Sequence, residues 1–80
     1  MSVTFIAVGL LKSMCPAWRA SGGRLRAKGA EGQRLDDACR QLGLPMELIS
    51  MFVINGEVQS GAYVLKPDDE VKCIALVGGG

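Results

Sequence analysis

One short amphipathic helix pattern, in a chain where most other apolar segments have strand character, constrains the fold most. Four apolar residues recur at helical spacing: Leu35, Ala38, Cys39 and Leu42. Asp36 and Asp37 occupy the first turn, where the helix dipole favours anions, and Gly43 follows as a stop signal. A single helix can cover one face of one sheet, so the core is expected between these two layers.

Five segments have the composition of strands: Val3–Leu11, Arg24–Ala27, Phe52–Ile54, Glu57–Gln59 and Val71–Val77. The dipeptide Asn55-Gly56 tolerates positive φ and predicts a tight hairpin between the third and fourth segments. The stretch Lys12–Gly23, with Pro16 and two adjacent glycines, is predicted to be a loop or wide turn. The order β-β-α-β-β-β predicts an α+β roll of the β-grasp kind, with a mixed sheet of four to five strands covered on one face by the helix.

Length and composition argue against a self-sufficient enzyme. The 80 residues suffice for one domain, residues 1–80, and leave little room for an enclosed active site. The chain contains no histidine, which removes Ser-His-Asp and Cys-His catalysis. A formal charge of +1 gives no general field for nucleic acid, and no segment is apolar enough to span a membrane. No signal peptide is visible, so we expect a cytoplasmic protein.

The three cysteines are not spaced for a metal site. There is no Cys-x-x-Cys pair and no histidine to complete a zinc tetrahedron, so no bound metal is expected. Cys39 lies on the apolar stripe of the helix and Cys73 has core parity in the last strand, so both are expected to be buried. Cys15 is the only cysteine that could be exposed, and a persulfide or thioester role for it stays open. Trp18 either packs over a core edge or anchors a partner.

The segment Val77-Gly78-Gly79-Gly80 follows directly on the last apolar run. Glycines without side chains form a thin strip that a partner enzyme can thread into a narrow cleft. We therefore expect residues 77–80 to be a flexible glycine tail with the carboxylate of Gly80 as its reactive group. The alternative is a frayed terminus or an expression scar.

Three motifs in order and spacing resemble the MoaD/ThiS family of ubiquitin-like sulfur carriers: Phe52-Val53-Ile54-Asn55-Gly56-Glu57, Leu65-Lys66-Pro67-Asp68-Asp69-Glu70-Val71 and Val77-Gly78-Gly79-Gly80. Asp68 replaces the family's usual turn glycine, which is tolerable because Asp visits left-handed conformations readily. The ending resembles ThiS, whereas the long segment before the helix resembles the larger MoaD layout. The pathway stays open, with molybdopterin or tungsten-pterin biosynthesis slightly favoured over the thiamin thiazole.

The resemblance implies a mechanism in which the protein is a carrier and no enzyme. A ubiquitin-activating-like adenylyltransferase would use ATP to adenylate the carboxylate of Gly80, and sulfur from a persulfide would displace AMP to leave a thiocarboxylate. Gly78 and Gly79 would allow the tail to thread, and no cofactor would be bound. A synthase, either the large subunit of molybdopterin synthase or thiazole synthase, would accept the sulfur. Two other functions stay open: a covalent protein modifier using the same Gly80, and a non-covalent β-grasp interaction module.

Docking to two enzymes requires an exposed apolar surface. Alternate residues of a strand point to opposite faces, so if Val71 and Cys73 face the helix, Ile74 and Leu76 lie on the open face. The residues expected to bind partners lie on or beside this face: Ile6, Val8, Ile74, Leu76 and Val77. The alternative is that a loop covers these residues as ordinary core.

Overall fold

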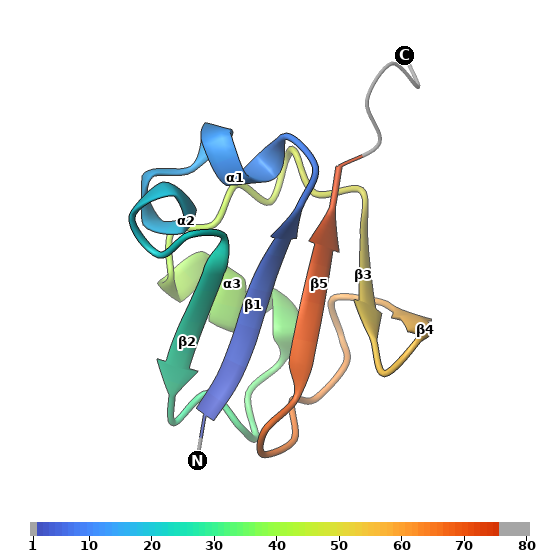
Figure 1. Cartoon of the computed structure of the whole chain (residues 1–80). Coiled ribbons are helices and arrows are strands. Elements are labelled where there is room, and N and C mark those ends of the chain that lie inside the picture. The colour runs from blue at the N-terminus through green and yellow to red at the C-terminus, as the bar shows by residue number, and fades with distance from the viewer. Residues whose placement is uncertain (1, 76–80) are drawn as a thin grey trace.

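The computed structural model describes residues 2–75, and Figure 1 shows the arrangement of its elements. They are β1 (Ser2–Val8), α1 (Leu11–Met14), α2 (Pro16–Ala20), β2 (Arg24–Lys28), α3 (Leu35–Gln41), β3 (Met51–Ile54), β4 (Glu57–Gln59) and β5 (Glu70–Ile74). The strands form one sheet in the order β2-β1-β5-β3-β4. β1 and β5 are parallel and the other neighbours are antiparallel, which confirms the predicted α+β architecture with a mixed sheet.

The main helix, α3, starts without a side-chain cap. Instead, the backbone N–H of Leu35 donates to the carbonyl of Tyr63 at 2.8 Å, and the N–H of Asp36 donates to the carbonyl of Gly61 at 3.0 Å. These bonds satisfy N–H groups that have no partner inside the helix. The segment before β5 therefore fixes where α3 begins.

The C-terminus of α3 is closed by the predicted glycine. Gly43 has a φ of 73°, a left-handed conformation that costs glycine little. Its N–H donates to the carbonyl of Arg40, and the N–H of Leu44 donates to the carbonyl of Cys39. This pair of bonds is a Schellman motif, which satisfies the last carbonyls and turns the chain towards β3.

The core lies between α3 and one face of the sheet. Its fully buried members include Val3, Phe5, Leu35, Cys39, Val71 and Cys73. The prediction that Cys39 and Cys73 are core residues is confirmed. A hydrogen bond with Cys39, together with burial, raises the pKa of the Cys73 thiol and keeps it protonated. Leu42, expected in the core, is only partly buried at the end of the helix.

The prediction of a loop over Lys12–Gly23 is wrong, because this segment contributes most of α1 and all of α2. Pro16 is the first residue of α2, where its missing N–H breaks no helical bond. Trp18 packs in the core, fully buried, and its Nε1–H donates to the carbonyl of Phe5 at 3.0 Å. Cys15, the one cysteine for which the sequence left exposure open, is buried with 3% exposure. That burial argues against a persulfide or thioester role.

Two tight turns follow the sequence prediction. Asn55 and Gly56 both have positive φ, 54° and 80°, as a hairpin that joins β3 to β4 with two residues requires. Asp68 also has a positive φ, 65°, in the turn before β5. Strand β1 ends at Val8, earlier than expected, because Gly9 adopts a φ of 72° and turns the chain into α1.

Candidate functional site

One face of the sheet is covered by none of the helices in residues 2–75 (Figure 1). The alternation of the strands determines which side chains lie on this open face. In β1, Val3 and Phe5 point into the core, so Ile6 and Val8 point to the open face, where they are half-buried. In β5, Val71 and Cys73 point into the core and Ile74 is half-buried. The structure thus brings Ile6, Val8 and Ile74 together on the open face.

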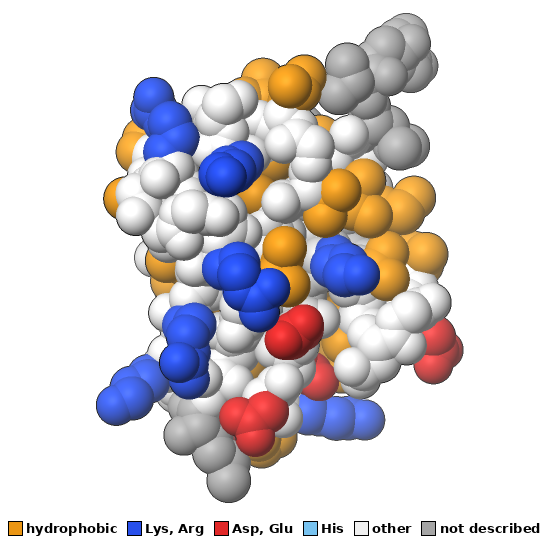
Figure 2. Space-filling view, viewed as in Figure 1, with side chains coloured by type: hydrophobic (Ala, Val, Ile, Leu, Met, Phe, Trp, Pro, Cys, Tyr) orange, Lys and Arg blue, Asp and Glu red, His pale blue; other side chains and the backbone are white. Residues whose placement is uncertain are grey.

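The register of the strands arranges these side chains in rows. Ile74 lies between Val8 of β1 and Met51 of β3. In the next row Lys72 lies between Ile6 and Val53, and Val53 pairs with Val58 of β4. We call the apolar members of these two rows the apolar patch: Ile6, Val8, Met51, Val53, Val58 and Ile74. Figure 2 shows apolar side chains gathered on this face.

Three members of the apolar patch were missed by sequence reasoning: Met51, Val53 and Val58. Met51 and Val53 alternate with the buried Phe52 and Ile54, so the parity of β3 could have placed them on the open face. Val58, 66% exposed, belongs to a strand too short for such an argument. The predicted site residues Leu76, Val77, Gly78, Gly79 and Gly80 lie outside the described residues.

The apolar patch lies at the end of the sheet where the chain leaves β5. Because β1 and β5 are parallel, this is also the end where β1 leads into α1. Leu10 and Met14 are both 52% exposed there. The backbone N–H of Ser50 donates to the carbonyl of Ile74 at 2.7 Å, which holds the end of β5 beside the start of β3. An exposed apolar surface therefore adjoins the point from which the chain continues to the glycines.

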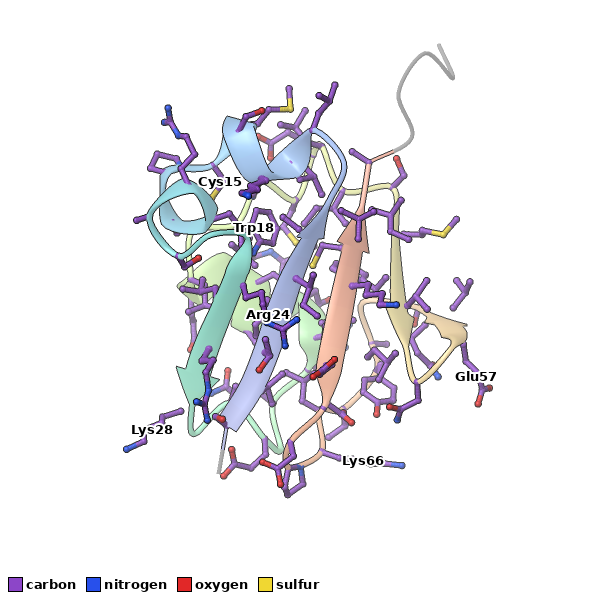
Figure 3. All side chains as sticks on the ribbon, viewed as in Figure 1. Cys15, Trp18, Arg24, Lys28, Glu57 and Lys66 are labelled. Carbon is purple, nitrogen blue, oxygen red and sulfur yellow. The ribbon has the colours of Figure 1, made fainter. Side chains whose placement is uncertain are left out.

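The opposite end of the open face is polar. The Nη2 atom of Arg24 lies 3.4 Å from Oε2 of Glu70, and both side chains are more than half exposed. Arg26 donates from Nη2 to Oγ of Ser2 at 3.1 Å. Arg24 projects over the sheet from β2, as Figure 3 shows. The open face therefore carries the apolar patch towards the exit of β5 and charged groups towards its start, with Arg24 reaching Glu70 from a position beside Ile6.

The turn that begins β5 is built around a buried carboxylate. Oδ2 of Asp69, a residue that is 7% exposed, accepts hydrogen bonds from the hydroxyl of Tyr63 at 2.8 Å and from the backbone N–H of Lys66 at 2.9 Å. Burial, and then the hydrogen bond from the Tyr63 hydroxyl to Asp69, raise the pKa of Tyr63. The two bonds set the point at which β5 starts, and with it the register of Lys72 and Ile74.

Within residues 2–75, no group of three or more His, Cys, Asp or Glu side chains is placed to hold a metal ion. None of the helices in this part of the chain is long and apolar enough to cross a bilayer. These residues present an exposed apolar surface with charged groups beside it.

Comparison with known proteins identifies the fold. No protein-family model matches the chain, and no curated protein matches its sequence. Among solved structures, the chain is similar to the crystal structure of SAMP1 from Haloferax volcanii, with a TM-score of 0.71 and 18% sequence identity over 100% of both chains. The five-stranded mixed sheet with α3 across one face has the ubiquitin-like β-grasp fold, as the sequence predicted.

Proposed function

We propose that the protein is a small cytoplasmic sulfur carrier that acts through the carboxylate of Gly80. A free carboxylate is a poor electrophile, and adenylation by a partner enzyme gives it AMP as a leaving group. A persulfide then displaces AMP, and cleavage of the new S–S bond by a thiol leaves a thiocarboxylate. The sulfur is passed on in the biosynthesis of a cofactor, with the molybdopterin or tungsten-pterin pathway slightly favoured over that of the thiamin thiazole.

The observation that carries this proposal is the position of the apolar patch. It adjoins the end of β5, from which the chain continues to Gly78, Gly79 and Gly80. A partner that binds the patch is therefore next to the segment that it has to modify. An exposed apolar surface on a small protein is typical of a docking site. The ubiquitin-like fold and the spacing of the motifs from Phe52 onward agree with this function.

The carrier depends on two partners in turn, an adenylyltransferase of the ubiquitin-activating type and a sulfur-accepting synthase. Both have to reach Gly80, so both are expected to use the apolar patch, together with Leu76 and Val77. Their binding is then mutually exclusive, and the affinity for the adenylyltransferase is modest enough to allow release. The adenylation chemistry belongs to that enzyme, and this chain supplies the docking surface and the acyl group.

Intact-mass analysis tests the proposal. The full-length protein is incubated with the adenylyltransferase of the same organism, ATP and a persulfide donor. Its mass should rise by the difference between sulfur and oxygen, localised to Gly80. Deleting Gly80 or adding one residue after it should abolish the product without changing the circular dichroism spectrum. Sulfur transfer by the extended variant would refute the mechanism, and adducts to protein lysines in cells would indicate a covalent modifier.

A further inference from the structure

One row of side chains crosses the whole open face of the sheet. Its members, from β2 to β4, are Arg24, Ile6, Lys72, Val53 and Val58. Lys72 occupies the central strand, β5, with Ile6 on one side and Val53 on the other. The apolar patch therefore has a cation near its centre.

The ammonium group of Lys72 is not neutralised within the part of the chain that the structure describes. The side chain is exposed, and none of the salt bridges among residues 2–75 involves it. Glu70, two residues before Lys72 on the same face of β5, is in contact with Arg24 instead. Of the two cations in this row, Arg24 thus has an ionic partner among residues 2–75, and Lys72 has none among them.

Docking changes the electrostatic situation of Lys72. Lys72 lies between Ile6 and Val53 in the register, so an apolar surface that covers these residues and Ile74 also removes water from the side chain of Lys72. A charge buried without a partner is costly, whereas one that meets a carboxylate recovers much of that cost. A wholly apolar partner surface would therefore bind poorly, and the patch favours a partner with an acidic side chain opposite Lys72.

The neighbours of Lys72 restrict where that acidic side chain can lie. Glu70 is two residues away on the same face and repels a second carboxylate. Ile74 lies two residues away on the other side, towards the exit of β5. The partner's carboxylate is thus expected on the Ile74 side of Lys72. Arg24 lies two strands away from Lys72, about 10 Å at the usual strand spacing. If its side chain leaves Glu70, Arg24 can bind a second acidic side chain of the partner.

We propose, on the basis of the sulfur-carrier function above, that Lys72 is a specificity-determining residue for the enzyme that activates Gly80. That adenylyltransferase presents an Asp or Glu carboxylate to Lys72 from within an otherwise apolar docking surface. The charge selects this enzyme over other apolar surfaces, because only a partner with a correctly placed carboxylate avoids the cost of burying the ammonium group.

The test measures binding of the full-length protein to the adenylyltransferase of the same organism by calorimetry, at low and high salt. Lys72→Glu should weaken binding by about tenfold or more, because two carboxylates then face each other. Lys72→Arg should keep most of the affinity for the adenylyltransferase. The affinity of Lys72→Met should lie between those of Lys72→Arg and Lys72→Glu. Lys66→Glu is the matched control, since Lys66 is exposed in the turn at the other end of β5 (Figure 3).

Carbodiimide cross-linking identifies the contact directly. The reagent joins an amine to a carboxylate in contact with it, so peptide mapping should find Lys72 linked to an Asp or Glu of the enzyme. Lys72→Arg should bind but lose the cross-link. Lys72→Met and Lys72→Glu variants that bind like the wild type, while Gly80 still becomes a thiocarboxylate, would overturn the role of Lys72 and leave the proposed function intact. If the enzyme neither binds nor activates the wild-type protein, both the role of Lys72 and the proposed sulfur-carrier function would be overturned.

Discussion

The indole Nε1–H of Trp18 donates a hydrogen bond to the backbone carbonyl of Phe5 at 3.0 Å, and both side chains are fully buried. Trp18 belongs to α2 and Phe5 to β1, so this bond ties the short helices to the centre of the sheet. A buried indole N–H needs such an acceptor. The segment between β1 and β2 is therefore part of the core and stabilises the end of the sheet next to the apolar patch.

Replacing Trp18 should destabilise the fold severely. Trp18→Ala removes the largest fully buried side chain and should cost about 3–5 kcal/mol, a large share of the roughly 5–15 kcal/mol that stabilises a typical domain. Trp18→Phe keeps a ring but loses the hydrogen bond and should cost less. Urea denaturation followed by circular dichroism measures both, since the only tryptophan is lost. A cost below about 1 kcal/mol for Trp18→Ala would contradict this packing.

The sequence was informative where a periodic pattern was long enough to read. The stripe through Leu35 and Cys39 predicted α3 and its buried face, and the alternation in β5 placed Cys73 in the core. Asn55-Gly56 predicted the hairpin because few residues adopt two consecutive positive φ angles. In these places local preference and tertiary packing agree.

The sequence was uninformative where the structure depends on contacts between distant segments. α1 and α2 span four and five residues, too few for a periodic pattern, and the burial of Trp18 depends on β1. Val53 joins the apolar patch only because β3 pairs with β5, which the sequence does not specify. The central position of Lys72 follows from the same pairing.

The apolar patch should bind the adenylyltransferase through the row of Val8, Ile74 and Met51, which lies nearest the exit of β5. Ile74→Asp places a charge between Val8 and Met51 and should weaken binding by several kcal/mol if the charge stays unpaired. Because Ile74 is half-buried, some loss of thermal stability is also expected. Val64→Asp is the matched control, since Val64 is 53% exposed and pairs with Arg34 away from the patch. Equal affinities for the two variants would exclude Ile74 from the interface.

The hairpin between β3 and β4 should depend on glycine at position 56. Gly56 has a φ of 80°, and a Cβ added there meets no atom within 4 Å, so backbone strain alone opposes a substitution. Gly56→Ala should therefore cost about 1 kcal/mol or more. Gly56→Asn should cost less, because Asn tolerates the left-handed region better. Urea denaturation gives the free energy of unfolding of both variants. An equal loss for Gly56→Ala and Gly56→Asn would mean that backbone strain does not cause the destabilisation.

The hydroxyl of Tyr63 should make the stability of the protein depend on pH in the alkaline range. Burial, and then the hydrogen bond to Asp69, raise the pKa of Tyr63 above its usual 10.0. The folded state thus favours the neutral phenol. The contribution is fully present below the pKa of the unfolded chain and is lost as pH rises through the higher pKa of the folded protein.

The titration of Tyr63 can be followed directly, because the chain has one tyrosine and the absorbance of tyrosinate reports it alone. The titration midpoint of the native protein should lie above the midpoint measured in denaturant. Asp69→Asn should lower the native midpoint, since it removes the negative charge that faces the hydroxyl at 2.8 Å. The free energy of unfolding should fall as pH rises above the unfolded pKa, and fall less steeply for Tyr63→Phe, which has no phenol to ionise. Identical midpoints in the native and denatured proteins would show that the Tyr63 hydroxyl is solvated and that Asp69 alone organises the turn before β5.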